Sequence, residues 1–416
     1  MARSLVAPGQ RRRRRVVGHA GGRERDPSLR RPRASGHAAA GALESGRPLR
    51  RARWHAVLAR RAAPGLHRPQ VEPQTQRKET SSMSTAPRPL VVVSAPLHKD
   101  ALVMLERECR VIVTDDPTEA GMIRTAADAQ GILFRGRPSS TASLMEACTR
   151  LKVVGRHGVG LDSVDIPAAT RLGVAVVHAP GSNSQAVAEH ALTLMLACTK
   201  RVLTIDKATR AGDWGARGHG GDRAGGNTEL GGKTLGIVGI GNVGRRVAKF
   251  AGAIGMTVLA YDKYVPADEV RRRGAEPVSS LEALVPQVDY LTCHTPLTPE
   301  TKHMINARTL GLMKDGAIYV NTSRGGVQDE RAVFEALTRG KLGAAGIDVF
   351  EEEPTPLDNP ILNLPNVVVS CHVAGVTNEA NRQMGVQVAG EMLRVLRGER
   401  PNVLVNPDVW PRLGQR

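Results

Sequence analysis

Short apolar runs alternate with amphipathic stretches along most of this 416-residue chain. From residue 90 onward the apolar runs are LVVVS, VIVT, GILFR, KVVG and VAVVH, and segments with apolar residues at helical spacing separate them, beginning with residues 99–110. Short runs rich in β-branched residues are typical of buried parallel strands. The alternation of strands and helices therefore predicts an open α/β sheet.

A second series of strands and helices begins near residue 234, with the runs LGIVG, VLAYD, YLTCHTP, AIYVNTS, GAAGIDV and NVVVS. Between the two series, residues 183–211 are apolar at helical spacing and start with Asn and Ser, so one connecting helix is expected. The glycine-rich stretch 213–227 should be a mobile surface loop. A last amphipathic helix is expected over residues 378–397. The chain is also too long for one compact unit, which favours two doubly wound domains.

The positive charge of the chain is concentrated at its N-terminus. Residues 1–82 hold 20 Lys and Arg against 5 Asp and Glu, a net of +15 out of the total of +18, which leaves +3 for the other 334 residues. This segment has neither a helical nor a strand period and is predicted to be disordered. It could be a transit peptide, a nucleic-acid-binding tail or a segment upstream of a natural start at Met83. A nearly neutral remainder suits an enzyme that acts on a small anion.

The cysteines and the hydropathy exclude several classes of protein. The five cysteines are scattered and form no CxxC pair, so neither a disulfide framework nor a metal site is expected. Cys293 and Cys371 are expected to pack within apolar strands. No apolar run is long enough for a transmembrane helix or a secretory signal, and a cytoplasmic location is predicted.

A glycine-rich motif after the apolar run LGIV predicts a dinucleotide site. Gly239, Gly241 and Gly244 lie between a predicted strand and a predicted helix, and Asp262 follows the next strand, 18 residues after Gly244. The first two glycines permit a tight turn and close approach of the backbone to a pyrophosphate, and the third permits close packing of the helix on the strand. An acid at Asp262 can bind both ribose hydroxyls, which favours NAD, although the adjacent Lys263 weakens the preference over NADP.

Six motifs in order carry a resemblance to a known family: GRHGVGLDSVD, the glycine motif with YDKY, HTPLTPET, NTSRGGVQDE, GAAGIDVFEEEP and SCHVAG. The chain from about residue 89 to 407 resembles the D-isomer-specific 2-hydroxyacid dehydrogenases, most closely the phosphoglycerate dehydrogenases that lack a C-terminal regulatory domain. The resemblance implies a flavodoxin-like substrate domain, residues 83–187 and 373–416, split around an inserted NAD-binding Rossmann domain, residues 188–372. It also implies a homodimer.

The same resemblance implies a catalytic trio of Arg324, Glu353 and His372, whose residue types suit the chemistry. A planar guanidinium can hold a substrate carboxylate through two hydrogen bonds, which is the role expected of Arg324. Hydride arrival at C2 of a keto acid builds negative charge on the carbonyl oxygen, so an imidazolium at His372 must donate a proton there. A carboxylate at Glu353 would orient that ring and favour its charged form.

Further positions are predicted from the resemblance to bind cofactor or substrate. Around the glycine motif and along the strand ends, the NAD site is expected to include Asn242, Val243, Thr295, Pro296, Thr322, Ser323 and Asp348, with Asp348 near the carboxamide. The loop from His157 to Gly160 is expected to bind the substrate carboxylate through Gly158, Val159 and Gly160. Arg135 and Arg137 are candidates for a phosphate on the substrate, or are surface charges. His190 is expected to be structural.

The sequence thus predicts reversible hydride transfer between NAD and a small 2-hydroxy acid, with 3-phosphoglycerate and phosphohydroxypyruvate as the leading pair. A glyoxylate or hydroxypyruvate reductase would use the same trio on an unphosphorylated acid. A transcriptional corepressor of the same fold, which senses NAD without turnover, is an alternative from another class. A DNA-binding protein with a vestigial enzyme fold is a third, and it requires salt-dependent binding through residues 1–82.

Overall fold

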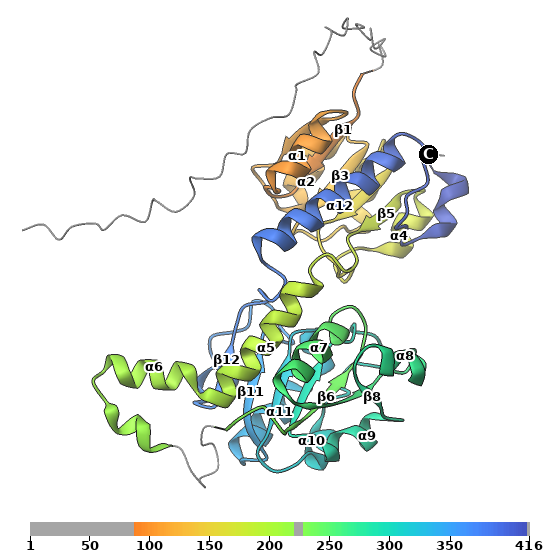
Figure 1. Ribbon diagram of the computed structural model, residues 1–416. Helices are drawn as coiled ribbons and strands as arrows, with labels where there is room; N and C mark the ends of the chain where they lie inside the picture. The colour runs from red at the N-terminus through yellow and green to blue at the C-terminus, as the bar shows by residue number, and fades with distance from the viewer. Residues whose placement is uncertain (1–86, 220–227, 414–416) are drawn as a thin grey trace, which may run out of the picture. The chain divides into compact units, whose positions relative to one another are not determined.

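The computed structural model describes residues 87–219 and 228–413. The predicted disordered extension, residues 1–82, lies outside the described residues. The described chain forms two parallel sheets with helices on both faces (Figure 1).

The first sheet has five parallel strands in the order β2-β1-β3-β4-β5. The strands are β1 (Leu90–Val93), β2 (Arg110–Val113), β3 (Gly131–Phe134), β4 (Val153–Arg156) and β5 (Ala175–His178). This strand order is that of flavodoxin-like sheets, in which ligands bind beyond the carboxyl ends of the strands.

The alternation of side chains along each strand explains how this sheet is covered. Val91 and Val93 contribute to a core with α1 (Lys99–Glu106) and α12 (Asn378–Leu396). Val92 points to the other face and packs with α2 (Glu119–Ala126), α3 (Ala142–Ala147) and α4 (Ile166–Arg171). Both faces are apolar because both are covered. The helix α12, from near the end of the chain, therefore completes a sheet built from its beginning.

The second sheet has seven parallel strands in the order β12-β11-β10-β9-β6-β7-β8. They are β6 (Thr234–Val238), β7 (Thr257–Tyr261), β8 (Glu276–Pro277), β9 (Tyr290–Cys293), β10 (Ala317–Asn321), β11 (Leu342–Ile347) and β12 (Val367–Val369). Counted from β6, the order is 3-2-1-4-5-6 with a seventh strand added, which is the arrangement of dinucleotide-binding domains. The two-residue strand β8 was not predicted from the sequence because it has no apolar run.

Helices cover both faces of the second sheet as well. One core contains α5 (Ser184–Lys200), α7 (Gly244–Ile254) and α8 (Ala267–Arg272), and the other contains α9 (Leu281–Leu284), α10 (Ala307–Leu312) and α11 (Glu330–Thr338). The predicted fold class, two doubly wound domains with the nucleotide domain inserted in a split flavodoxin-like domain, is confirmed, while the exact boundaries at residues 187/188 and 372/373 stay predictions.

The prediction of one connecting helix over residues 183–211 is wrong. The segment forms two helices, α5 and α6 (Val202–Arg210), and Arg201 between them has a left-handed backbone at φ +50°. The reason is packing. Helix α5 buries residues up to Thr199, whereas α6 buries none, so no core contact keeps the chain on the axis of α5.

Two further expectations are corrected. The amphipathic stretch 99–110 is helical only to Glu106, and Arg110 already begins β2. Cys371 is exposed in the loop after β12 and does not pack within a strand, whereas Cys293 is buried in β9 as expected. Of the predicted mobile loop, Trp214–His219 form a 3-10 helix and residues 220–227 lie outside the described residues.

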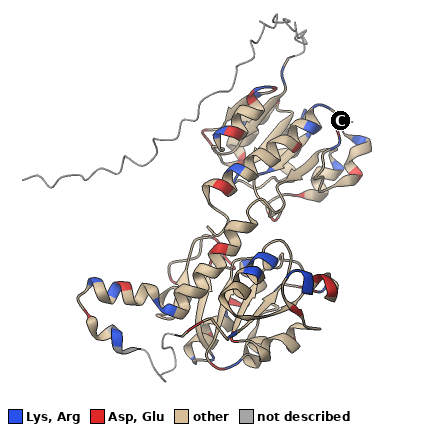
Figure 2. Cartoon of the chain, in the orientation of Figure 1, with Lys and Arg blue, Asp and Glu red and all other residues tan. Residues whose placement is uncertain are grey.

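Charged residues of both signs are interspersed along the described elements (Figure 2). This agrees with the nearly neutral composition of the chain after residue 82. Among residues 87–219 and 228–413, none of the helices has the length and apolarity that crossing a membrane requires.

Candidate active site

His372 and Glu353 form a hydrogen-bonded pair at the carboxyl edge of the second sheet. Glu353 follows β11, His372 follows β12, and the His372 Nδ1 and Glu353 Oε2 atoms are 2.7 Å apart. The other carboxylate oxygen of Glu353 accepts a hydrogen bond from the Phe350 amide at 3.1 Å. The carboxylate therefore fixes the orientation of the imidazole, and the predicted pairing of these two residues is present in the structure.

The environment of this pair favours the charged imidazole. The hydrogen bond that His372 donates to Glu353 raises the pKa of His372 above its ordinary value, against the opposing effects of burial and of the nearby Arg324. Burial alone would raise the pKa of Glu353, but the hydrogen bond and charge of His372 leave it lowered. The pair thus retains an imidazolium next to a carboxylate, as a proton donor requires.

Two other histidines near the site have the opposite character. His157 is buried and its Nε2–H donates to the Asn381 carbonyl at 3.2 Å; burial lowers its pKa to about 4. Burial likewise lowers the pKa of His294 to about 3. Both rings are therefore neutral near pH 7, which leaves His372 as the histidine of the group suited to donate a proton.

A buried carboxylate holds the loop that carries His372. Asp348 has no exposed surface and accepts hydrogen bonds from the amides of Val373 and Ala374, at 2.9 and 3.0 Å. It also accepts the Ser370 hydroxyl at 2.6 Å, while His190 Nε2 lies 2.9 Å from that hydroxyl. His372 itself has φ +56°, a conformation that a histidine adopts only when its surroundings hold it there. In this structure Asp348 positions the His372 loop, and its predicted proximity to a carboxamide stays a prediction.

Arg324 follows β10 and is held by the segment after β4. Its Nε donates to Asp162 Oδ2 at 2.9 Å, and its Nη1 donates to the Ser323 carbonyl at 2.7 Å. The guanidinium lies so close to Gly160 that a Cβ on that residue would be 2.1 Å from Nη2. Glycine is therefore required at Gly160 for Arg324 to lie here, and the structure brings the predicted carboxylate loop next to the predicted carboxylate-binding arginine.

The rest of that loop follows the first sheet. The carbonyl of Gly158 accepts the Ala179 amide at 3.0 Å, and the carbonyl of Val159 accepts a hydrogen bond from His178 Nδ1 at 3.0 Å. Gly158 has φ +138°, which explains its identity. These contacts use carbonyls and leave the loop's amides as the groups that could bind an anion.

Three arginines lie beyond the carboxyl ends of β3 and β4. Arg137 donates to the carbonyl of the catalytic candidate Glu353 at 3.0 Å, and Arg135 donates to the Pro96 carbonyl. Arg156, at the end of β4, was missed in the sequence analysis. Its Nε is buried without a hydrogen-bond partner among the described residues, and burial, followed by the charge of Arg324, lowers the pKa of the guanidinium. The signal was available, because Arg156 is the polar residue that ends an apolar strand within the motif GRHGVGLDSVD.

The glycine motif has the local geometry predicted for it. Gly239 has φ +87°, and a Cβ there would lie 2.8 Å from Thr295 Cγ2. A Cβ on Gly244 would lie 2.2 Å from the Gly239 carbonyl, so α7 starts directly against the strand end. Nothing lies within 4 Å of a Cβ built on Gly241, which leaves open space over the turn. The turn thus has the open backbone and the helix N-terminus that a pyrophosphate requires.

The polar side chains around this turn have the chemistry that a bound dinucleotide needs. The hydroxyls of Thr295 and Thr322 are buried without a hydrogen-bond partner in the described part of the chain. Buried polar groups are normally bonded, so two such hydroxyls on neighbouring strand ends indicate a missing ligand. Asp262 Oδ2 accepts the Ile240 amide at 2.9 Å and so holds the glycine turn itself. These residues fit a bound NAD.

The remaining predicted cofactor residues have structural contacts. The Ser323 hydroxyl donates to Asn321 Oδ1 at 2.8 Å, the Pro296 carbonyl accepts the Thr301 hydroxyl at 2.7 Å, and the Asn242 carbonyl accepts Arg246 Nη1 at 2.6 Å. Val243 is the N-cap residue directly before α7. They lie at the strand ends and turn of the expected site, and their roles towards NAD stay predictions.

Comparison with known proteins identifies the family. A family model described as the NAD binding domain of D-isomer specific 2-hydroxyacid dehydrogenases matches residues 192–374. Together with the relatives below, this shows that the chain belongs to the D-isomer specific 2-hydroxyacid dehydrogenase family.

Among its relatives, the D-3-phosphoglycerate dehydrogenase of Methanocaldococcus jannaschii is 40% identical over 77% of this chain, and the match spans 60% of that protein. The hydroxypyruvate reductase of Thermotoga maritima is 37% identical over 74% of this chain and 98% of that protein. The structure of the D-lactate dehydrogenase of Aquifex aeolicus, complexed with NAD and lactic acid, matches with a TM-score of 0.66 and 28% identity over 76% of this chain and 99% of that one. The chain thus spans about 60% of the length of the first relative and nearly the whole of the other two.

Proposed function

We propose that this protein is an NAD-dependent D-2-hydroxyacid dehydrogenase. The observation that carries the proposal is the His372–Glu353 pair at 2.7 Å, with Arg324 close enough to oppose the charge of His372. A proton donor, its orienting carboxylate and a guanidinium for the substrate carboxylate are the groups that keto-acid reduction requires.

In the reducing direction, Arg324 binds the substrate carboxylate and thereby orients C2 and its carbonyl. Bound NADH supplies the hydride that C2 receives. The His372 imidazolium donates its Nε2 proton to the carbonyl oxygen as negative charge develops there. The neutral imidazole that results stays hydrogen-bonded through Nδ1 to Glu353, and it accepts the hydroxyl proton when the reaction runs in reverse.

We propose 3-phosphoglycerate and phosphohydroxypyruvate as the substrate pair. Arg135 and Arg137 follow β3, Arg156 is the last residue of the neighbouring strand β4, and the side-chain hydrogen bonds of all three go to backbone carbonyls. A phosphate can replace such neutral acceptors with a charge-assisted hydrogen bond, which is the stronger interaction. The phosphoglycerate dehydrogenase among the relatives supports this choice.

A glyoxylate or hydroxypyruvate reductase is the second candidate. The observation in its favour is coverage, because the match spans 98% of the Thermotoga maritima hydroxypyruvate reductase but only 60% of the Methanocaldococcus jannaschii phosphoglycerate dehydrogenase. The mechanism would be the same, and the arginines after β3 and β4 would face solvent or a plain carboxylate.

Steady-state rates of the purified full chain test both candidates. NADH oxidation is measured with phosphohydroxypyruvate, hydroxypyruvate, glyoxylate and pyruvate, for the wild type and for His372→Ala. Loss of the general acid should lower kcat by about 10²- to 10⁴-fold without weakening NADH binding. Preference for an unphosphorylated acid would select the reductase. Binding of NADH without turnover of any of the four would overturn the enzyme and favour an NAD-sensing binding protein.

We further propose that the protein acts as a homodimer. Helix α6 has no buried residue, and Val202 and Leu203 are 50% and 58% exposed, with Trp214 at 71% just beyond it. An apolar helix face of this kind is stabilised when a second copy covers it. Light scattering after gel filtration should give twice the chain mass for the wild type and the single mass for Leu203→Asp. A monomeric wild type would contradict the proposal.

The cytoplasmic location of the protein stays a prediction.

A further inference from the structure

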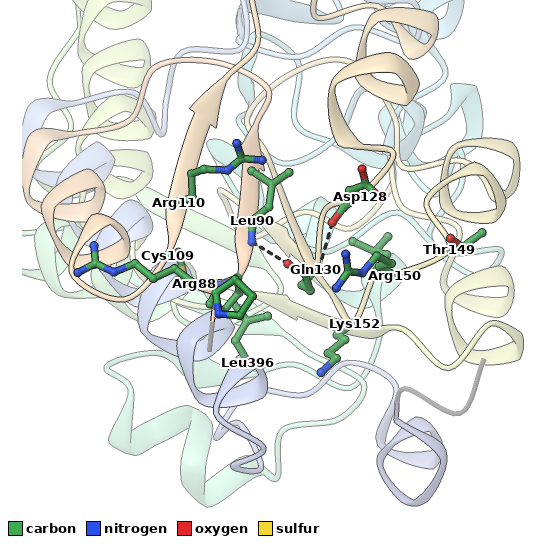
Figure 3. A pocket seen from close by; sticks show the side chains of 13 residues that line it. Arg88, Leu90, Cys109, Arg110, Asp128, Gln130, Thr149, Arg150, Lys152 and Leu396 are labelled. Carbon is green, nitrogen blue, oxygen red and sulfur yellow. Dashed lines mark hydrogen bonds between the residues drawn. The ribbon is translucent and has the colours of Figure 1, made fainter. Parts of the chain in front are cut away.

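A cavity of about 920 Å³ opens at the amino edge of the five-stranded sheet (Figure 3). Leu90 and Arg110 are the first residues of β1 and β2, and Gln130 and Lys152 directly precede β3 and β4. In a parallel sheet the amino ends of all strands share one edge, and the proposed active site uses the opposite, carboxyl edge. The cavity is therefore separate from the site described above.

The walls of the cavity are strongly positive. Its lining includes the cations Arg88, Arg110, Arg150 and Lys152 and a single carboxylate, Asp128, which leaves three net positive charges. Burial raises the pKa of the Cys109 thiol in the wall to about 11, so this group adds no negative charge. Concave surfaces lined by charges of one sign concentrate ions of the opposite sign.

Within the described residues these cations have no counter-charge. None of the four side chains makes an ion pair with another described residue, and of the four only the Arg88 side chain has a hydrogen bond there, to the Glu106 carbonyl at 3.3 Å. By contrast, the nearby Arg397 on the same sheet's edge is paired with Glu108. The four cations line one cavity, and an anion bound in it would interact favourably with them.

The Gln130 side chain in the lining of the cavity is held by two hydrogen bonds. Gln130 stands between Arg110 on one side and Arg150 on the other (Figure 3), and its side chain accepts the Leu90 amide at 2.7 Å and donates to the Asp128 carbonyl at 3.1 Å. Leu90, Leu151 and Leu396 provide apolar surface beside it. The volume lies within the range of small-molecule sites.

From this geometry we infer that the amino edge of the five-stranded sheet binds a small polyanion, a molecule with at least two phosphate or carboxylate groups. A polyanion that spans the cavity would contact Arg110 at one wall and Arg150 and Lys152 at the other. Guanidinium groups bind such oxygens through paired hydrogen bonds.

Calorimetric titration of the full chain with pyrophosphate, at physiological salt, tests the inference. The test variant is the double substitution Arg150→Ala with Lys152→Ala. The matched control is Lys99→Ala with Arg107→Ala, which removes two exposed cations of the same sheet unit that lie outside the cavity and make no ion pair with described residues. We expect pyrophosphate to bind the wild type and the control equally and the cavity variant about tenfold more weakly. Keto-acid reduction and the melting temperature should be unchanged in both variants.

Two results would overturn the inference. Equal binding to all three proteins would place pyrophosphate on the basic extension or elsewhere, and loss of binding only in Arg135→Ala would place it in the active site. Citrate and acetate complete the test. Tighter binding of pyrophosphate than citrate would identify phosphate groups, the reverse would identify carboxylates, and acetate binding as tightly as either would contradict a polyanion site.

Discussion

The carboxyl edges of the two sheets hold their charged groups in different ways. Beyond the first sheet, the arginines Arg135, Arg137 and Arg156 donate to neutral backbone carbonyls. Beyond the second, His372 is bound by the carboxylate of Glu353, and Arg324 by that of Asp162. The first edge keeps cations that an anion can readily attract, whereas the second fixes the position and the charge of the groups proposed to act on the substrate.

This difference has a physical basis. A hydrogen bond from a cation to a neutral carbonyl is weaker than one to an anion, so an incoming phosphate is preferred over it. A proton donor, in contrast, must keep one ring orientation and one protonation state, and a bound carboxylate provides both. Binding cations and catalytic groups can therefore be told apart by their partners.

Of the substitutions that test this difference between the two edges, replacement of Arg324 should lower the activity most. Arg324→Lys keeps the charge but loses the planar arrangement of donors, so Asp162 and the substrate carboxylate can no longer both be bound in the same geometry. We expect kcat/KM for the keto acid to fall by on the order of 10²-fold, with NADH affinity unchanged. Steady-state kinetics and NADH fluorescence titration measure the two quantities. Full activity in the lysine variant would show that only the charge is needed.

Replacing Glu353 should change the pH dependence as well as the rate. Glu353→Gln removes the largest cause of the raised pKa of His372, so that pKa falls. Reduction needs the imidazolium and is lost as pH rises through the pKa, so its descending limb should move to lower pH. The ascending limb of the oxidation should move in the same direction. We expect kcat for reduction near pH 7.5 to fall by about 10- to 100-fold. If the descending limb stayed at the same pH, a group other than His372 would determine the pH dependence of the rate.

Replacing Arg137 should affect phosphorylated substrates selectively. Arg137→Ala removes a cation from the first edge, and we expect kcat/KM for phosphohydroxypyruvate to fall by about tenfold. The value for glyoxylate should hardly change. Arg107→Ala, at an exposed arginine directly after α1, is the control. If kcat/KM fell equally for both substrates, the role of Arg137 would be to hold Glu353, whose carbonyl it binds, and not to bind a phosphate.

The smallest effect is expected at the cofactor hydroxyls. Thr322→Val removes a buried hydroxyl that lacks a partner within the described residues, so the melting temperature should stay the same or rise while NADH binds about fivefold more weakly. Thr309→Val is the matched contrast, because the Thr309 hydroxyl completes the capping box of α10 with Asn306. That variant should lose about 1 kcal/mol of stability without any change in NADH affinity. If Thr322→Val and Thr309→Val lowered the stability equally, the Thr322 hydroxyl would have a structural role like that of Thr309.

The sequence by itself determined the two α/β sheets and the glycine turn, while the catalytic trio was predicted from the resemblance to a known family. Buried parallel strands need continuous apolar runs, and a tight turn over a pyrophosphate needs glycine at set spacings, so local composition was sufficient. Only the tertiary structure decided the break at Arg201, the exposure of Cys371, and the contacts of Arg324 with Asp162 and of Asp348 with the His372 loop. Those features depend on residues distant in sequence: helix α5 ends where the second sheet no longer covers it, and Asp162 meets Arg324 across 162 positions of chain. The local pattern of apolar and polar residues does not predict such a contact, because the fold as a whole brings the partners together.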